Sequence, residues 1–366
     1  MNAVPQPDKR KHWQRLVWHP LLRPLNDPDA IDDLLAQLNP VWSLRQARAR
    51  VVEVIEETAD ARTYVLRPNR HWRGFRAGQH ALIEVEIAGV REQRCYSLSR
   101  APGGDGRLAI TVKRQPEGRV SGWLHTQLKA GQVLGLGQAE GEFVLPDELP
   151  ERILLLSAGS GITPMRALLG ELRRRGFAGE VTLLHACRGA EDFIFGAELQ
   201  ELARAWPAFR LQLHDTRRDG RLDAAALAIA VPDFAQQATW LCGPSAYMQW
   251  VREAYRAQGA LDRLRTESFG APVAESTEAV AGAANVQCRI SNRSFNANNG
   301  SPLLVEAENA GLQPRYGCRR GICRTCLCRK RSGQVENLLT GALSAPGEEW
   351  IQLCISAARS DLVLDV

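Results

Sequence analysis

Four cysteines near the C-terminus constrain the fold of this chain most strongly. Cys318, Cys323 and Cys326 form a C-x4-C-x2-C run, and Cys354 follows in a separate segment. This spacing is typical of a [2Fe–2S] cluster, whose two irons need four thiolates, three of them from one tight loop. Zinc is the alternative, but zinc sites usually use paired C-x2-C units. We therefore expect these four cysteines to bind a [2Fe–2S] cluster in a C-terminal domain.

Cysteine usage and charge limit where the chain works and what it binds. Prolines interrupt the first 28 residues, and no window approaches 18 consecutive apolar residues, so we expect a cytoplasmic chain with neither a secretory signal nor a membrane span. Cysteines in a reducing compartment are metal ligands or redox groups before they are disulfides. The net charge of +5 is too small for a nucleic-acid binder. It permits docking to an acidic partner or to an anionic membrane surface.

The 366 residues predict two or three domains. Residues 1–45 are expected to be an extension with a helix over 31–38, capped by Asp29 and ended by Asn39 and Pro40. This extension either clamps the next domain or docks to a membrane or partner. Residues 46–148 show short alternating segments that predict an antiparallel β-barrel with one helix near 122–128. The expected strands are 51–55, 63–66, 80–87, 93–98 and 108–113.

From residue 149 the pattern changes to alternating strands and helices, which predicts a parallel sheet covered on both faces. This domain should extend to residue 270. Its expected strands are 153–157, 181–185, 211–214, 239–242 and 264–266, and its expected helices are 164–175, 197–205, 223–230 and 246–258. Residues 271–285 are small and polar and predict a linker. Residues 286–366 then form the cysteine-rich third domain.

Two groups of residues in the predicted barrel suit a phosphate-bearing aromatic ligand. Arg94, Tyr96 and Ser97 end one expected strand, where a ring can stack and a guanidinium can pair with phosphate. The segments Val112-Lys113 and Gly118, Val120, Ser121 follow, the second at the start of a helix. Amide groups at a helix start suit a pyrophosphate. Taken alone, each group is also compatible with an ordinary strand or helix.

The second domain carries a matching set of strand-end signals. Gly159 and Gly161 follow the first strand, Thr163 is the expected N-cap and Pro164 the first helical residue, which would bring backbone close to a phosphate. A plain glycine-rich turn is the alternative. Cys242, Gly243 and Pro244 end a later strand. Arg188, Thr216 and Arg217 follow two others, where guanidinium groups suit the 2′-phosphate of NADPH. NADH, with these arginines as solvated loop charges, remains the other option.

Taken in chain order, these motifs resemble the ferredoxin–NADP reductase superfamily with a fused C-terminal plant-type ferredoxin. The resemblance implies an antiparallel β-barrel flavin domain, an α/β parallel-sheet nucleotide domain and an α+β ferredoxin domain of the β-grasp type. It implies FAD, NADPH and a [2Fe–2S] cluster as cofactors. Cys242 would lie beside the nicotinamide, and Ser97 and Glu267 would shape the hydride pocket. Phe269 would lie near the flavin. Arg324 stands where many family members have glycine.

The resemblance also implies a function. Hydride would pass from NAD(P)H to FAD, and single electrons would leave through the cluster. The segment 38–43 resembles reductases that serve membrane fatty-acyl desaturases, so we expect a membrane di-iron desaturase or an alkane-type hydroxylase as the acceptor. A soluble ring-hydroxylating oxygenase and a non-catalytic redox sensor are the alternatives. Residues 315–331 hold seven Lys and Arg and no acid, which is either ordinary surface charge or a docking face for an acidic partner.

Overall fold

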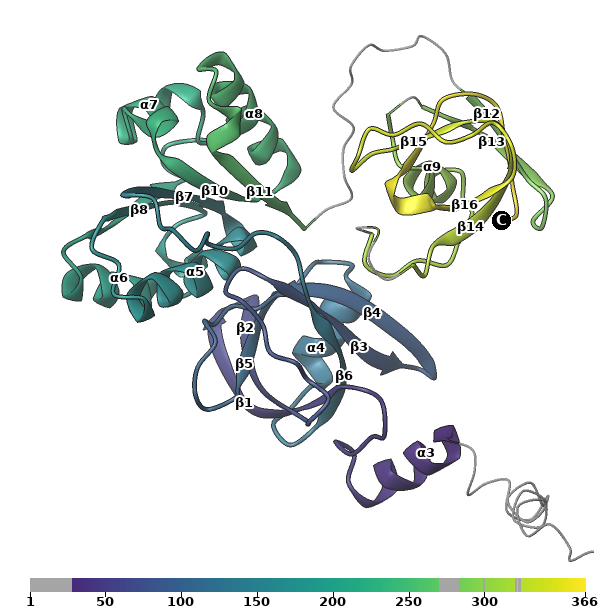
Figure 1. Cartoon of the computed structure of the whole chain (residues 1–366), viewed down its shortest axis with the longest axis horizontal. Helices are drawn as coiled ribbons and strands as arrows, with labels where there is room; N and C mark the ends of the chain where they lie inside the picture. The colour runs from purple at the N-terminus through teal and green to yellow at the C-terminus, as the bar shows by residue number, and fades with distance from the viewer. Residues whose placement is uncertain (1–27, 270–283, 299, 320, 322–323) are drawn as a thin grey trace, which may run out of the picture.

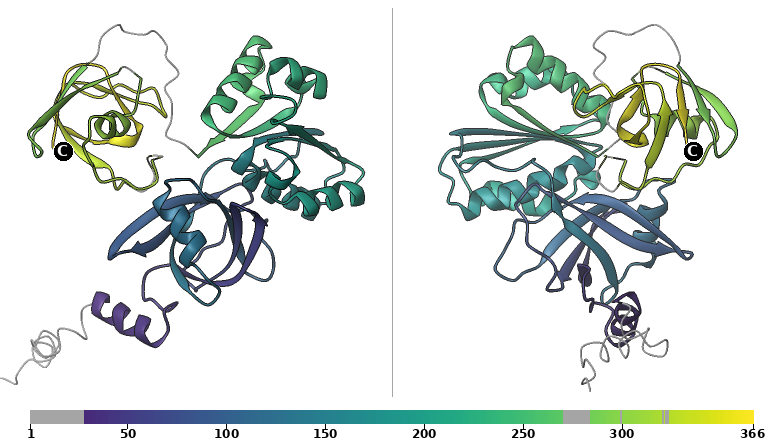
Figure 2. Two further views of the ribbon diagram at one scale, coloured as in Figure 1. Left: turned by 180° about the vertical axis from the view of Figure 1, so that it is seen from behind. Right: turned by 45° about the vertical axis from the view of Figure 1, so that its right-hand side comes forward.

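The computed structural model describes residues 28–269, 284–298, 300–319, 321 and 324–366. It contains a β-barrel, a parallel-sheet domain and a mixed α+β domain, with one helix projecting from the far side of the barrel (Figures 1 and 2). The predicted fold class is therefore confirmed. Within the described residues, each helix is too short or too polar to cross a bilayer. The first 27 residues of the extension and most of the expected linker lie outside the described residues.

Helix α3 (Pro28–Leu38) lies in the predicted N-terminal extension. It begins at Pro28, so the prediction that Asp29 caps it was wrong; proline suits a first helical position because its φ is already helical. Beyond the helix, the Asp32 carboxylate accepts hydrogen bonds from the Leu44 amide at 2.5 Å and the Ser43 hydroxyl at 2.9 Å. These bonds fold the segment after α3 back against the helix.

The barrel is one six-stranded antiparallel sheet in the order β4-β3-β6-β1-β2-β5. A bridge between Leu98 and Ile110 joins its two edge strands. Helix α4 (Arg119–Gln127) contributes Val120 and Leu124 to the buried core. The strands are β1 (Arg48–Thr58), β2 (Ala61–Pro68), β3 (His80–Ile87), β4 (Val90–Ser97), β5 (Leu108–Lys113) and β6 (Val133–Glu140).

Strand β6 was not predicted from the sequence. It contains Gly135 and Gly137, and glycine weakens the signature of a strand. Both glycines are explained by close packing, because a Cβ on either would come 2.9 Å from the Cβ of Glu84 or Leu82 on β3. The feature that hides the strand in the sequence is therefore the one that lets β3 and β6 approach.

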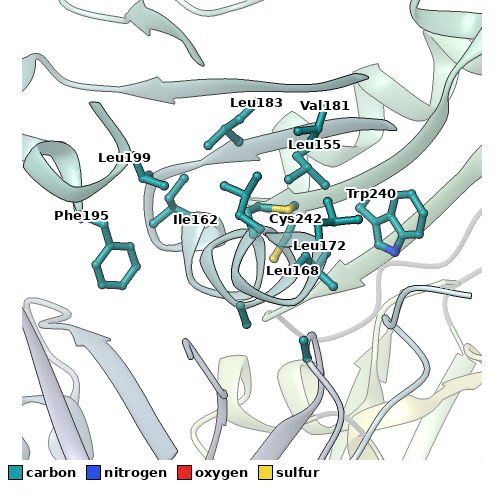
Figure 3. Close-up of a cluster of buried hydrophobic side chains, with 14 of the residues drawn as sticks. Leu155, Ile162, Leu168, Leu172, Val181, Leu183, Phe195, Leu199, Trp240 and Cys242 are labelled. Carbon is teal, nitrogen blue, oxygen red and sulfur yellow. The ribbon is translucent and has the colours of Figure 1, made fainter. Parts of the chain in front are cut away.

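The second domain is a five-stranded parallel sheet in the order β11-β10-β7-β8-β9. One face packs against α5 and α6, and the other against α7 and α8. Figure 3 shows the first of these cores, with Cys242 among leucine, valine and isoleucine side chains. The strands are β7 (Arg152–Ala158), β8 (Glu180–Cys187), β9 (Phe209–Asp215), β10 (Ala238–Gly243) and β11 (Leu264–Ser268). The helices are α5 (Ile162–Arg174), α6 (Gly196–Ala205), α7 (Ala224–Ala230) and α8 (Ser245–Ala257).

The third domain combines a mixed five-stranded sheet, in the order β13-β12-β18-β14-β16, with a two-stranded sheet and helix α9 (Leu303–Asn309). Strand β12 begins at Ala284, so the last two residues of the predicted linker 271–285 belong to the sheet. Cys354 lies in a 3-10 turn (Leu353–Ile355) between strands. The strands are β12 (Ala284–Cys288), β13 (Arg293–Ala297), β14 (Leu327–Ser332), β15 (Val335–Asn337), β16 (Glu349–Gln352), β17 (Ser356–Ala358) and β18 (Leu362–Leu364).

Candidate functional site

Three buried polar side chains meet where the barrel contacts the parallel-sheet domain. Ser97, the last residue of β4, lies opposite His80, the first residue of β3. Glu267 reaches them from β11: one carboxylate oxygen lies 3.2 Å from the Ser97 hydroxyl, and the other lies 3.0 Å from His80 Nδ1. All three residues are at most 4% exposed. The predicted pair Ser97 and Glu267 is thus brought together, with a histidine that the sequence analysis did not identify.

Cys242 lies on β10 directly opposite Glu267 on the neighbouring strand. Its side chain is fully buried in the core shown in Figure 3. Strand β10 ends at Gly243, and Pro244 precedes helix α8, as the sequence predicts. The position of Cys242 one strand away from Glu267 fits the predicted hydride pocket, and its catalytic role stays a prediction.

The turn after β7 is built around glycine. Residues Gly159–Gly161 form a 3-10 turn, and Gly161 is the N-cap of α5. Thr163 and Pro164 lie inside the helix, so the expectation that Thr163 is the N-cap was wrong; its hydroxyl donates to the Ser160 carbonyl at 3.0 Å. A Cβ on Gly161 would meet the Cys242 carbonyl oxygen at 2.1 Å. The turn and the end of β10 are therefore in direct backbone contact.

Arg94 approaches the third domain from β4. The Arg94 guanidinium lies 5.2 Å from the centre of the Tyr316 ring, and Arg319 stacks on the same ring at 4.0 Å. Tyr316 lies two residues before Cys318, and Arg319 directly follows it. Arg94 also donates to the Gln93 carbonyl at 2.8 Å. Burial raises the pKa of the Tyr96 phenol, so this ring stays protonated. The strand end predicted to hold the flavin thus touches the loop predicted to hold the cluster.

The second group of residues predicted to bind the flavin, in segments 112–113 and 118–121, is only partly assembled. Val112 and Val120 are buried in the barrel core, and Ser121 accepts from the Gln115 amide at 3.1 Å next to Gly118, the N-cap of α4. The α4 start therefore has the predicted form.

Lys113 is placed differently. Its ammonium pairs with Asp60 at 3.1 Å and with Asp192 from the parallel-sheet domain. Its observed role is to join the two domains.

The two arginines expected to bind the 2′-phosphate, Arg188 and Arg217, are paired with acidic side chains. Arg217 pairs with Glu191, and the Thr216 hydroxyl donates to the Cys187 carbonyl at 3.1 Å. Arg188 lies 3.2 Å from Asp192. Burial opposes ionisation of Asp192, but hydrogen bonds from Arg188 and Lys113 hold the pKa of this carboxyl below its usual value. Arg217 is exposed, and only its salt bridge with Glu191 competes with a phosphate.

Two of the four predicted cluster ligands are in contact. The sulfurs of Cys326 and Cys354 lie 3.2 Å apart, and the Gly321 amide donates to Cys354 at 3.3 Å. Their contact and burial raise the pKa of the Cys354 thiol, so binding as a thiolate needs a cation to compensate. Cys318 is buried, and Cys323 lies outside the described residues. The described side chains form no group of three metal ligands, and the four-cysteine set stays a prediction at the level of residues.

Three further residues lie next to these sites. Phe269 is half-buried against the core of the parallel-sheet domain. Cys328 is buried and is a free thiol, and burial raises the pKa of this thiol to about 12. Arg324 adopts a left-handed φ of 56°, the conformation that glycine favours. This explains why glycine is common at the position of Arg324 in the resembling family.

His80 is the residue that sequence reasoning missed. Its Nε2 is buried and has no hydrogen-bond partner among the residues that the structure describes. A buried nitrogen of this kind normally has a partner, so the pocket fits a polar ligand beside Ser97 and Glu267. Nothing in the local sequence marks it, because strand β3 also carries the polar residues Glu84 and Glu86.

Comparisons with known proteins match all three domains. Family models describe residues 48–144 as an oxidoreductase FAD-binding domain, residues 155–253 as an oxidoreductase NAD-binding domain and residues 286–359 as a 2Fe-2S iron-sulfur cluster binding domain. The chain is 38% identical to an NADPH oxidoreductase of Mycobacterium tuberculosis, over 95% of this chain and 93% of the relative. It is 30% identical to a glycine betaine monooxygenase reductase subunit of Chromohalobacter salexigens, over 89% of this chain and 98% of the relative.

Among solved structures, phthalate dioxygenase reductase has the same fold, with a TM-score of 0.59 and 23% identity over 87% of this chain and 97% of that one. The fold and the matched domains define a flavin and iron–sulfur electron-transfer reductase. The chain belongs to the family of reductases that join FAD-binding, NAD-binding and [2Fe–2S] domains, and it uses FAD, NAD(P)H and a [2Fe–2S] cluster.

The geometry assigns separate tasks to the chain's own residues. When bound, FAD converts a hydride from NAD(P)H into two single electrons. Arg94, Tyr96 and the start of α4 would hold it, and Ser97 places a hydroxyl at the strand end. Glu267 accepts a hydrogen bond from the Ser97 hydroxyl and thereby fixes its direction. The Arg94–Tyr316 contact keeps the cluster loop against the flavin-binding strand.

Proposed function

We propose that this chain is an NADPH-dependent reductase that supplies electrons to a membrane-bound di-iron enzyme, either a fatty-acyl desaturase or an alkane-type hydroxylase. In this proposal the reductase works at the inner face of the membrane without spanning it. The observation that carries the proposal is an apolar face on α3 and the segment after it. Leu34, Leu38 and Trp42 are 54%, 71% and 50% exposed.

This apolar face is held rigidly to the barrel. Arg50 donates to the Asn39 side chain at 2.7 Å, and the Asn69 amide donates to the Val41 carbonyl at 3.0 Å. His71 adds a hydrogen bond to the Ser43 carbonyl at 2.9 Å. A segment fixed in place while its large apolar side chains face solvent suits an apolar surface outside the chain. The position of α3 on the far side of the barrel (Figure 2) leaves the third domain accessible to the acceptor.

NADPH is preferred in this proposal because of Arg217. It lies just after β9 and is 61% exposed at its side chain, so it is free to exchange Glu191 for a phosphate. The name of the mycobacterial relative, NADPH oxidoreductase, supports the same choice.

A soluble oxygenase is the second candidate acceptor, and the names of several relatives favour it. They include glycine betaine monooxygenase reductase subunits and the ferredoxin reductase component of 3-ketosteroid-9-alpha-monooxygenase. In this version the exposed face of α3 binds an oxygenase and not a bilayer. A redox sensor without turnover is the third reading, and the assembled Ser97–Glu267 pair argues against it.

The deciding experiment measures acyl desaturation by the holoenzyme with NADPH and membranes that contain a fatty-acyl desaturase. Turnover should exceed that with membranes lacking the desaturase. The double variant Leu34→Ser, Leu38→Ser should reduce desaturation at least about fivefold while leaving cytochrome c reduction unchanged. Ile229→Ser is the matched control, because Ile229 is 82% exposed on α7. Equal turnover with both membranes, together with activity toward a purified oxygenase, would contradict the desaturase proposal.

A further inference from the structure

The solvent face of the strand pair β14–β16 carries two large apolar side chains. The register pairs Leu327 with Gln352 and Arg329 with Trp350. Because paired and alternate residues share a face, these four side chains lie together on one side of the sheet. Leu327 is 43% exposed and Trp350 is 62% exposed. This face is therefore open to solvent and is not covered by the other two domains.

The opposite face of the same strands is tightly packed. Cys328, Lys330 and Ile351 alternate with the outer residues and are at most 6% exposed. In such a strand pair, alternation normally puts apolar residues inside and polar residues outside. A leucine and a tryptophan nevertheless occupy neighbouring outer positions. Adjacent exposed apolar side chains on a well-packed sheet indicate an interaction surface.

This outer face lies directly beside the loop predicted to bind the cluster. Leu327 follows Cys326 in the chain, and the Cys326 carbonyl accepts a hydrogen bond from the Leu353 amide at 3.2 Å. The Gln352 side chain donates to the Gly321 carbonyl at 2.6 Å. The strands that carry the apolar face are thus bonded to the backbone of the cysteine loop.

The two ends of the cysteine loop have different neighbours. Tyr316, two residues before Cys318, contacts Arg94 of the flavin-binding barrel. Leu327, one residue after Cys326, faces solvent. Electrons that enter the third domain from the barrel therefore have an exit at Leu327, which an outside protein can reach without displacing the barrel.

The charges around this face favour an acidic partner. Arg315 and Arg324 are exposed, and no ion pair holds either of them within the part of the chain that the structure describes. Arg329 lies 6.0 Å from the centre of the Trp350 ring, pairs with Glu348 and is still 43% exposed at its side chain. Guanidinium groups around an apolar centre are complementary to carboxylates around an apolar patch.

We propose that the outer face of β14–β16, centred on Leu327 and Trp350, is the surface on which the electron acceptor docks. The partner that fits is a protein whose own docking surface sets carboxylates around an apolar patch. Each encounter oxidises the third domain by one electron and reduces the acceptor by one. One NAD(P)H, oxidised to NAD(P)+ and a proton, therefore supports two encounters. The inference rests on the electron-transfer activity of the family and not on the choice of a membrane acceptor.

The test uses the full-length holoenzyme and cytochrome b5, an acidic haem protein that accepts one electron. Trp350→Ser and Leu327→Ser each remove part of the apolar centre, and Arg329→Gln removes one charge. Isothermal titration calorimetry gives the Kd between the two oxidised proteins, and steady-state kinetics with NADPH give the KM and kcat for cytochrome b5. Visible absorption checks that each variant keeps the flavin and cluster content of the parent.

We expect the Kd and KM for cytochrome b5 to rise about tenfold or more in Trp350→Ser, because truncation of a central aromatic anchor costs this much in affinity. Leu327→Ser should raise both about threefold or more. In both variants kcat should stay within about twofold, because the substitutions change docking and not the reacting groups. An unchanged Kd and KM in Trp350→Ser would overturn the proposal. The desaturase proposal would survive that result, since its test rests on α3.

Salt dependence tests the predicted charge of the partner. Arg329→Gln should weaken binding of cytochrome b5 at about 0.05 M salt and match the parent at about 0.5 M, because salt screens exposed charges. Binding of the basic protein cytochrome c should not weaken in the same variant. Equal weakening with both cytochromes would show that Arg329 does not select an acidic partner, and would contradict that part of the proposal.

Two other exposed apolar residues of the third domain are matched controls. Ile290 is 77% exposed in the turn between β12 and β13, at the other edge of the sheet, and Ile290→Ser should bind like the parent. Leu343 is 64% exposed and forms a bridge with Glu336, away from the β14–β16 face. Leu343→Ser should also bind like the parent. Weaker binding in Leu343→Ser, with none in Trp350→Ser, would place the acceptor on another surface and overturn the proposal.

Discussion

Gly161 lies so close to the peptide group of Cys242 that a Cβ on it would stand 2.1 Å from the carbonyl oxygen. Gly161→Ala should therefore push the start of α5 away from the end of β10. Overpacking of this kind destabilises a core by about 1–3 kcal/mol. Because this turn is expected to receive the nucleotide phosphates, we also expect the KM for NADPH to rise about tenfold or more.

Steady-state kinetics and thermal unfolding of the same preparation check both effects. Gly104→Ala is the matched control, because a Cβ at Gly104 meets nothing within 4 Å. An unchanged KM in Gly161→Ala would mean that the turn does not hold the nucleotide.

The Ser97 hydroxyl is expected to be needed for hydride transfer and not for folding. Ser97→Ala removes the donor to Glu267, and loss of a positioned proton-handling group typically slows a reaction by 10² or more. We expect flavin reduction by NADPH to slow about 10²-fold with flavin content unchanged. Ser99→Ala on the same strand end removes a buried hydroxyl bonded to Thr111 at 2.8 Å and should have little kinetic effect. Equal rates in the two variants would remove Ser97 from the mechanism.

Nucleotide preference should depend on the Arg217–Glu191 salt bridge. Arg217→Ala should lower kcat/KM for NADPH about tenfold and leave that for NADH nearly unchanged, because only NADPH carries the 2′-phosphate. Glu191→Gln should raise kcat/KM for NADPH, because it removes the carboxylate that competes with the 2′-phosphate for Arg217. Parallel kinetics with both nucleotides test this. A similar loss with NADH and NADPH would assign Arg217 to folding or to the shared part of the ligand.

His185 should make the parallel-sheet domain sensitive to acid. Burial lowers the pKa of His185 from 6.5 to about 3, so the folded domain excludes a proton that the unfolded chain binds below pH 6.5. This stability is present above pH 6.5 and is lost as the pH falls toward 3. Between pH 7 and pH 5 the loss is about 2 kcal/mol. Hydrogen exchange of the β8 amides at pH 7 and pH 5 should show this loss of stability in the parent and not in His185→Asn.

Lys330 should hold the third domain together. Its fully buried ammonium donates to the carbonyls of Gly333, Ala345 and Gly347 at 2.6–2.7 Å. Lys330→Met keeps the length of the chain but leaves three carbonyl oxygens without their donor, which should destabilise the domain by about 3 kcal/mol. Visible absorption of the cluster during heating measures the change. Lys129→Met, at an exposed lysine, should melt like the parent.

Much of the fold could be predicted because its strands and helices carry local signals. The expected strand 80–87 is β3 at both ends, and α7 begins after Asp223, whose side chain caps it at 2.8 Å. Strand β6 was missed because its glycines serve packing against another strand. The N-cap of α5 was misplaced for a similar reason, since Gly161 is dictated by Cys242.

Residues of the candidate site could be predicted where their motif lies in one segment of the sequence. Contacts that form only when distant segments meet could not be predicted. Ser97 and Glu267 could be named from resemblance, but their contact spans 170 residues and two domains. Nothing local to His80 marks it, because its importance comes only from the carboxylate that β11 brings to it. The pairing of Lys113 with Asp192 was likewise invisible, as it depends on how two domains pack.

The carboxylate that completes the barrel pocket is encoded at the end of the parallel-sheet domain, 187 residues from its histidine partner. A chimaera joined between the two domains would pair His80 with a foreign strand and separate His80 and Ser97 from their carboxylate partner. Exchange of modules among such reductases is therefore expected to preserve residues 46–269 as one inherited block. The boundary that tolerates recombination lies after Phe269, and the iron–sulfur module is the part that can be replaced to meet a new acceptor.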